Sequence, residues 1–414
     1  MTLDAATLDI DLTNAPRDRG EALLTDLDRV REHDPVYWSE KSQCWFITRH
    51  ADVAAGFLKR IPVTNEDRMW AVFMMIPKEE WDARIPTLVK YSQLWITSSE
   101  GPRHLRLRGL IMKAMTRSIV ENLRPYARAR AEHLINVALE AGDIEFNEGI
   151  SRPMTGDVLF RLLGMPEERF GELKDWATCL MEGVGATIPT PERLERADWA
   201  MAEMNKAVAH EIEKRRTDPK DDLITALLNA SEEGDRLTID EIYAQMHVMI
   251  VAGHDTTMNT ITLAVAALAR NPEAWAYVQA NPDKLPDIVQ ELQRYVGMVG
   301  GQPKLIAQDF ELGGKSLKAG QMAVLLIAAG DRDPNVFANP EQLDFTRDSK
   351  PSLVFGPGVH FCLGHHLAKL QLAEFIGALA RKVKRIEVLD DALDFMPVWV
   401  FRGLYKLNAR FTGR

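Results

Sequence analysis

The segment that decides the fold reads Phe355-Gly356-Pro357-Gly358-Val359-His360-Phe361-Cys362-Leu363-Gly364, and a helical pattern runs from about Leu363 to Arg381. Two glycines before the cysteine allow a tight turn that directs backbone amides at the sulfur. The positive end of the following helix favours ionisation of the thiol. The pattern therefore predicts a thiolate that is held at a helix start and suited to bind a metal.

Two other interpretations of this segment exist. A lone cysteine beside a turn is often a buried apolar side chain. A zinc site could combine Cys362 with His360, His365 and His366, but their spacing fits no common zinc site and no second ligand cluster follows. The five spaced residues around Cys362 favour the thiolate interpretation.

The overall composition narrows the class of protein. The 414 residues are 46% hydrophobic, and 50 basic against 60 acidic residues give a net charge of −10. This acidity argues against nucleic acid or an anionic membrane as the main partner. Residues 1–20 are polar, with no apolar run long enough for a signal peptide or membrane anchor. The three cysteines are far apart and odd in number, so we expect no disulfide framework and a cytoplasmic location.

The secondary-structure pattern indicates a mainly α protein with a small β portion. Pro35–Trp38 and Cys44–Thr48 predict a β-hairpin, and helical periodicity dominates from about residue 100. Short strands are expected at Leu305–Phe310 and Met322–Ile327. No linker or repeat is visible, so we expect a polar tail at 1–20 and a single domain at 21–414.

The clearest helix begins at Thr238, where Glu241 completes a capping box, and continues without proline to Arg270. At about 1.5 Å per residue it would span roughly 50 Å. Its middle, Ile250–Gly253, is apolar, so we expect the helix to run through the core.

An acid and a hydroxyl stand together in the middle of that helix, in Ala252-Gly253-His254-Asp255-Thr256-Thr257. A charged residue on a buried helix is costly unless it has a use, and Asp255 beside Thr256 could relay protons. Gly253 would leave room beside the helix, and His254 is expected to be structural or pocket-lining. The alternative is that both polar residues are tolerated, with Thr256 bonding back to the carbonyl four residues earlier.

These two motifs resemble those of the haem-thiolate monooxygenases, the cytochromes P-450, over about residues 35–410. The family signatures are Phe-Gly-x-Gly-x-His/Arg-x-Cys-x-Gly and Ala/Gly-Gly-x-Asp/Glu-Thr-Thr/Ser, and both are complete here. The resemblance implies a cytochrome P-450 fold with haem b (iron protoporphyrin IX) between the long central helix and the cysteine helix.

The resemblance also implies roles for individual residues. Cys362 would bind the iron, Thr256 would hydrogen-bond the oxygen to be split, and Asp255 would connect it to solvent. The other expected haem contacts are His104, Arg108, Gly253, Lys304, Phe355, Gly358, His360 and Gly364. His104 and Arg108 lie four residues apart on one helix and match propionate-binding positions, although a solvated basic face is the alternative. Lys304 stands where the family usually has an arginine, which grips a carboxylate as a fork.

Two further groups follow from the resemblance. Glu291, Arg294 and Arg347 match a structural set that supports the haem core. The expected substrate pocket is apolar and contains Trp70, Phe73, Met74, Val248, Ala252, Gly300, Gly301, Val398 and Trp399. A medium-sized hydrophobic substrate, such as a terpenoid, steroid or polycyclic aromatic, would fit.

The implied activity is a monooxygenase that uses O2 and two external electrons to hydroxylate or epoxidise its substrate. No reductase follows Arg414, so we expect the electrons to come from a separate ferredoxin or flavodoxin with its reductase. Basic residues near His104, namely Arg103, Arg106, Lys113 and Arg117, suggest a docking patch for that acidic donor. A peroxygenase or oxidative coupling enzyme is an alternative. A haem-binding sensor is a remote one, because a sensor has no need for the acid–hydroxyl pair.

Overall fold

The computed structural model describes residue 10 and residues 19–185, 190–232, 234–396 and 400–414. The helices are α3 (Ala22–His33), α4 (His50–Phe57), α5 (Arg68–Phe73), α6 (Trp81–Arg84), α7 (Pro86–Ser92), α8 (Gly101–Ala114), α9 (Arg117–Glu121), α10 (Arg124–Ala141), α11 (Arg152–Leu163), α12 (Phe170–Leu180), α13 (Pro191–Thr217), α14 (Leu223–Asn229), α15 (Ile239–Arg270), α16 (Pro272–Ala280), α17 (Leu285–Val296), α18 (Ile327–Gly330) and α19 (His365–Lys382). The expectation of a mainly helical protein is confirmed. The predicted tail at 1–20 lies almost entirely outside the described residues.

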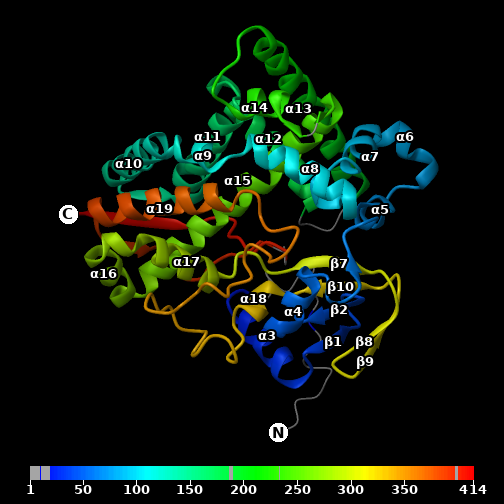
Figure 1. Cartoon of the computed structure of the whole chain (residues 1–414). Helices are drawn as coiled ribbons and strands as arrows, with labels where there is room; N and C mark the ends of the chain where they lie inside the picture. Colours follow the sequence, from blue (N-terminus) through cyan, green and yellow to red (C-terminus); the bar gives the residue numbers. More distant parts are fainter. Residues whose placement is uncertain (1–9, 11–18, 186–189, 233, 397–399) are drawn as a thin grey trace.

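The main sheet has the order β1-β2-β10-β7-β3, with β1 (Val36–Ser39), β2 (Cys44–Ile47), β3 (Val63–Thr64), β7 (Gln302–Ile306) and β10 (Met322–Leu325). The predicted β1–β2 hairpin is present and antiparallel, and β10 adds to β2 in parallel. In Figure 1 this sheet lies beside α3, α4 and α18, below the helical part of the molecule.

The remaining strands are β4 (Asp143–Glu145), β11 (Val383–Val388) and β12 (Asn408–Gly413) in one sheet, β5 (Ser231–Glu232) with β6 (Asp235–Arg236), and β8 (Phe310–Leu312) with β9 (Lys315–Leu317). The single strand expected at Leu305–Phe310 is wrong, because the chain leaves the main sheet after Ile306 and enters the β8–β9 hairpin at Phe310. The strand expected at Met322–Ile327 ends at Leu325, and α18 begins at Ile327.

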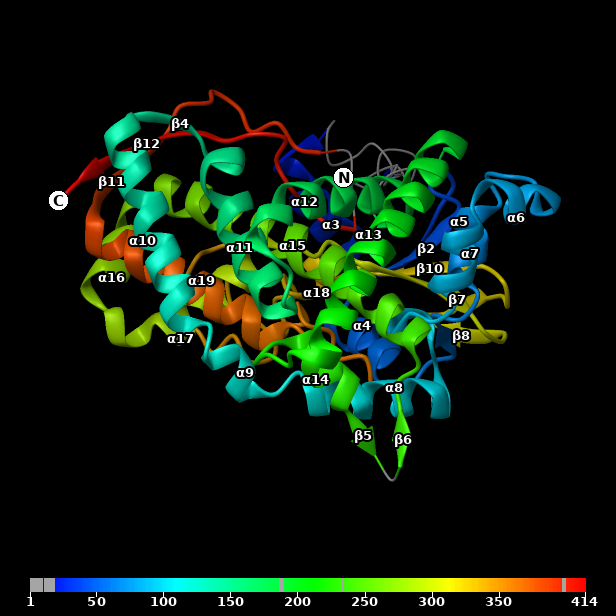
Figure 2. The ribbon, with the colours of Figure 1, turned by 90° about the horizontal axis from the view of Figure 1, so that it is seen from above.

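Helix α15 crosses the helical part of the molecule, as expected. It contacts α11, α12, α17 and α19, and Figures 1 and 2 both place it among these helices. Its N-terminus has the predicted capping box, in which Thr238 and Glu241 satisfy each other's backbone amides. No helix within the described ranges is both long and apolar enough to span a membrane.

The cysteine segment forms a tight loop that packs on the end of α4. Gly356 and Gly358 have φ angles of +64° and +95°, which glycine adopts far more readily than other residues. A Cβ at Gly358 would lie 2.6 Å from the carbonyl oxygen of Phe57, the last residue of α4. The backbone amide of Cys362 donates to the carbonyl of Phe355 at 2.9 Å and closes the loop.

The following helix begins later than expected. Helix α19 starts at His365, not next to Cys362, and Gly364 is its N-cap residue. The loop therefore places the sulfur just before the first turn of α19, where the amides of Gly364 and His365 hydrogen-bond to it.

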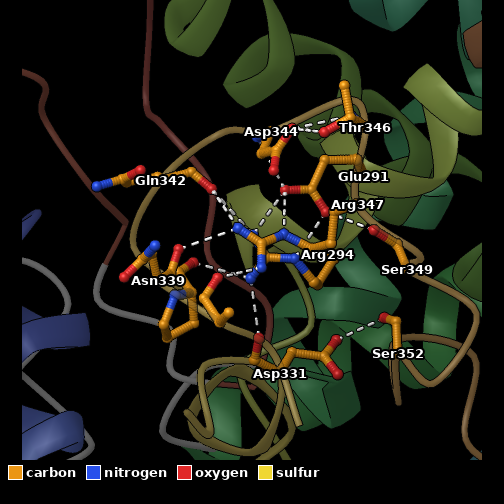
Figure 3. Close-up of polar contacts among 12 residues, drawn as sticks. Glu291, Arg294, Asp331, Asn339, Gln342, Asp344, Thr346, Arg347, Ser349 and Ser352 are labelled. Carbon is orange, nitrogen blue, oxygen red and sulfur yellow. Dashed lines mark hydrogen bonds and ion pairs between the residues drawn. The ribbon is translucent and has the colours of Figure 1, made fainter.

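Glu291 and Arg294 form a fully buried ion pair on α17 (Figure 3). Two guanidinium nitrogens of Arg294 donate to the two carboxylate oxygens of Glu291, each at 2.8 Å. Arg347 Nε lies 3.3 Å from Glu291 Oε1, and the Ser349 hydroxyl donates to Oε2 at 2.5 Å. Arg294 also donates to the carbonyls of Asp331, Pro340 and Gln342. The network thereby ties α17 to the long connection before the cysteine loop.

Replacing Glu291 by glutamine should lower the free energy of unfolding by about 3–5 kcal/mol, because it leaves the buried Arg294 charge without its partner. Denaturant unfolding measures this change. The matched control is Glu203→Gln, which breaks an exposed pair with Lys206 on α13 and should change stability little. Similar losses in the two variants would contradict this account of the network.

Replacing Gly358 by alanine should destabilise the protein through both its positive φ and the clash with Phe57. Gly314 is the matched control, since its φ is +77° but nothing lies within 4 Å of an added Cβ. Gly314→Ala should cost about 1–2 kcal/mol from backbone strain alone, and Gly358→Ala should cost clearly more. If thermal unfolding gives the same loss for both, close packing on α4 does not constrain the loop.

Candidate active site

The Cys362 side chain is partly buried, and three groups around it favour its ionised form. Burial raises the pKa of the thiol, whereas the amides of Gly364 and His365 and the guanidinium of Arg108 lower it. Metal coordination would complete the ionisation, because a coordinating thiol loses its proton. The zinc alternative finds no support, since the described part of the chain contains no group of three or more histidine, cysteine or acidic side chains that could hold a metal.

Basic side chains gather beside this loop, and they include the predicted His104, Arg108 and His360. The rings of His104 and His360 lie 4.0 Å apart between centroids. Arg108 donates from Nη2 to the carbonyl of Phe361 at 2.7 Å. Burial and the neighbouring cations lower the pKa of His104 to about 4, and its buried Nε2 has no hydrogen-bond partner among the described residues. The cluster can therefore still bind a carboxylate.

Glu100 belongs to the same cluster and was missed by the sequence reasoning. Its carboxylate lies 3.2 Å from His360 Nε2 and accepts from Lys59 Nζ at 2.6 Å and from the Asn65 amide at 3.0 Å. Burial would raise the pKa of Glu100, but these hydrogen bonds bring it down to about 2. The available signal was its position directly before Gly101-Pro102, at the start of α8.

Lys304 reaches this cluster indirectly. It is buried on β7, and its Nζ lies 2.5 Å from Asn65 Oδ1 and 5.5 Å from the centre of the Phe57 ring. Asn65 in turn donates its backbone amide to Glu100. A direct grip of Lys304 on a haem propionate stays a prediction.

The cysteine loop also presents an open surface beside the sulfur. A Cβ built at Gly364 would meet no described atom nearer than Cys362 Sγ, at 4.0 Å. Phe355 packs at 6.2 Å from the ring of Phe361 and 6.0 Å from that of His365. An open face at Gly364, a partly accessible thiol and a His104 nitrogen without a partner among the described residues fit a flat macrocycle that carries carboxylates and binds its iron through Cys362.

The predicted acid–hydroxyl pair lies on a face of α15 that is accessible to solvent, called the open face below. Ala252 is exposed although it lies in the middle of this helix, and Val248, Asp255 and Thr256 are partly exposed. Burial raises the pKa of Asp255 to about 6, and Arg152 opposes the rise. Thr256 donates from Oγ1 to the carbonyl of Ala252 at 2.6 Å, so the back-bonded geometry is present. The lone pairs of that hydroxyl remain able to accept a proton donor.

Two of the glycines predicted at the site contact neighbouring elements. A Cβ at Gly253 would lie 3.1 Å from Leu159 of α11, so the missing side chain allows α11 to pack closely on α15 and leaves no extra space on that side of the helix. A Cβ at Gly301 would lie 3.0 Å from the carbonyl oxygen of Leu325 on β10, so this glycine serves strand packing. Gly300 is buried, and its amide donates to Val400 at 2.9 Å.

The three predicted pocket residues on α5 and directly after it differ in their exposure to solvent. Trp70 stacks on Trp81 with ring centroids 5.0 Å apart, Phe73 is buried, and Met74 is 61% exposed. The place of Met74 in a substrate pocket stays a prediction, since no described cavity contains it. Val398 and Trp399 lie outside the described residues.

A cavity of about 250 Å³ lies beside α5. It is lined by Trp70 and Phe73 and by Glu66, Asp67, Met69, Ser92, Gln93, Ser98, Ser99, Glu100 and Arg103. The cavity is therefore more polar than the expected apolar pocket.

The comparisons with known proteins place this arrangement in a family. The family model for cytochrome P450 matches residues 187–385. Cytochrome P450 107B1 of Saccharopolyspora erythraea is 31% identical over 88% of this chain and 89% of its own length. The cyclomarin C epoxidase CymV of Salinispora arenicola is 29% identical over 91% of this chain and 93% of its own length.

A solved cytochrome P450 structure has the same fold as this chain. Cytochrome P450 CYP109Q5 from Chondromyces apiculatus superposes with a TM-score of 0.85 at 27% identity, covering 98% of this chain and 99% of that one. Proteins of the family bind haem b through a cysteine thiolate, and they are monooxygenases. The matching sequence and fold agree with the cysteine loop, and the chain belongs to the cytochrome P450 family.

Proposed function

We propose that this cytochrome P450 binds haem b through Cys362 and inserts one oxygen atom from O2 into a medium-sized hydrophobic molecule. The observation that carries the proposal is the Cys362 sulfur, which accepts the amides of Gly364 and His365 beside the His104–Arg108–His360 cluster. When bound, the haem supplies the iron at which dioxygen is reduced.

The side chains around this centre divide the remaining tasks. His104, Arg108 and His360 bind the haem carboxylates, and Glu100 and Lys59 hold His360 in place. The Thr256 hydroxyl would accept a proton as its own proton leaves, and would thereby relay it. Asp255 is the acid that supplies it, since burial raises its pKa to about 6 and so keeps a larger protonated fraction near neutral pH than an exposed aspartic acid has.

The substrate class follows from the aromatic part of the cavity. Trp70 and Phe73 line the cavity with aromatic rings. Val248 and Ala252 are not among its lining residues, but they present aliphatic side chains on the accessible face of α15. Epoxidation and hydroxylation both fit this setting, and the relative CymV is a cyclomarin C epoxidase.

The electrons come from a separate ferredoxin or flavodoxin with its reductase, in the cytoplasm. The exposed apolar residues Leu105 and Met112 on α8 lie among the basic residues Arg103, Lys113 and Arg117, which suits docking of an acidic carrier. Arg106 is excluded from the expected patch, because it is paired with Asp235 and Glu241.

The reduced protein with carbon monoxide should give the strongly red-shifted Soret band of a thiolate-ligated haem. Cys362→His should lose that band, because imidazole replaces the thiolate. The control is Cys179→Ser, which changes a buried cysteine on α12 and should keep the band. A globin-like band in the unchanged protein would contradict the ligand assignment.

Thr256→Ala should uncouple electron use from product formation, since the proton acceptor beside the oxygen is lost. Product per electron pair should fall about tenfold or more, with release of hydrogen peroxide. Thr260→Ala is the matched control, because Thr260 makes the same back-bond one turn later. Isotopically labelled O2 should appear in the product, and unlabelled product would favour an oxidative coupling enzyme or a peroxygenase.

A further inference from the structure

His254 lies on the opposite side of α15 from Ala252 and was expected to be structural or pocket-lining. It is fully buried, so it lines no open space. Its ring packs against α11, with Cε1 3.2 Å from the position of a Cβ at Gly156 and its centroid 6.1 Å from that of the Phe160 ring. Its one hydrogen-bond partner among the described residues is Thr155, whose Oγ1 lies 3.2 Å from Nδ1.

The geometry of Thr155 selects the tautomer of His254. A hydroxyl has a single proton to donate, and Thr155 directs it to the carbonyl of Ser151 at 3.0 Å, one turn earlier on the helix. Thr155 Oγ1 must then accept from His254. Nδ1 therefore carries the ring proton, and Nε2 is left with a free lone pair.

That nitrogen is buried and has no hydrogen-bond partner in the described part of the chain. The carboxyl oxygen Oδ1 of Asp255 lies 3.8 Å from it. This separation exceeds the length of a hydrogen bond, and a rotation of the Asp255 side chain can shorten it. Since a lone pair needs a proton donor, Asp255 can satisfy Nε2 only when its carboxyl is protonated.

Burial favours this protonated form, although the cations around the pair oppose it. Burial and the cations Arg152 of α11 and Lys174 of α12 lower the pKa of His254 to about 3, so the ring is neutral. Burial raises the pKa of Asp255 to about 6, against the pull of Arg152. Asp157 pairs with Lys174 at 3.0 Å and thereby offsets part of that charge.

We propose that His254, fixed as its Nδ1–H tautomer by Thr155, is a positioning residue that accepts a hydrogen bond from the protonated carboxyl of Asp255. The catalytic meaning of this contact rests on the proposed function, in which Asp255 supplies a proton to Thr256. The ring holds the acid on the α11 side of the helix, and a side-chain rotation releases it toward the open face.

The tautomer is tested directly in the carbonmonoxy form of the full-length reduced holoprotein. Nitrogen-15 NMR of labelled histidine should show one residue with a protonated Nδ1 and an unprotonated Nε2 that does not titrate near neutral pH. His254→Phe assigns that signal by removing it. A protonated Nε2 on His254 in the unchanged protein overturns the proposal.

The hydrogen bond is tested by infrared spectroscopy of protonated carboxyl groups in the same form. Asp255→Asn assigns the Asp255 band, and its intensity against pH gives the midpoint of ionisation. Thr155→Val frees the ring to adopt the Nε2–H tautomer, which donates to ionised Asp255. Ionisation then becomes easier, so the midpoint should fall by about one pH unit.

Thr155→Ser is the matched control, because it keeps the hydroxyl and should keep the midpoint. Equal midpoints for Thr155→Val and Thr155→Ser overturn the proposal, even if His254→Phe does not fold. Both measurements need neither substrate nor electron donor during the experiment. Their failure leaves the carbon monoxide band and product formation unaffected, so it is distinguishable from failure of the proposed function.

Discussion

The structure depends on placing an ionisable sulfur in a partly buried position and supplying it with fixed donors. Burial alone opposes the thiolate, and the compensating groups are two backbone amides at the start of α19 and the Arg108 guanidinium. Those amides point at the sulfur only because the loop turns through Gly356 and Gly358 and rests on the end of α4. The electrostatics of Cys362 are therefore a property of backbone geometry, which the close contact with Phe57 enforces.

In the basic cluster of His104, Arg108 and His360, an unfavourable effect of burial and charge is again offset by a fixed partner. Two histidines and an arginine close together repel one another when charged, and burial adds to the cost. Glu100 compensates part of this charge by holding His360 and Lys59. His104 stays neutral at physiological pH, with its pKa lowered to about 4, and keeps a free Nε2. The cluster thus already binds the carboxylate of Glu100, and His104 Nε2 can still bind a second carboxylate.

Local signals predicted the elements that they control. The capping box and the proline-free run of α15 and the aromatic hairpin of β1 and β2 were readable, because their determinants lie within a few residues. The sites of close packing were not readable. Whether Gly253 makes room for a ligand or for Leu159 depends on α11, about a hundred residues away in sequence. Glu100 was missed for the same reason, since its partners Lys59 and His360 come from other parts of the chain.

The position of the acid on α15 follows from helix geometry. Successive residues of an α-helix point about 100° apart, so a residue next to both faces can reach either. Ala252 and Thr256 lie on the open face, and His254 lies on the face buried against α11. Asp255 lies between His254 and Thr256 and is partly exposed. An acid at this position can keep its proton in a buried setting and still turn toward solvent or toward the hydroxyl. An acid placed wholly on either face could do only one of these things.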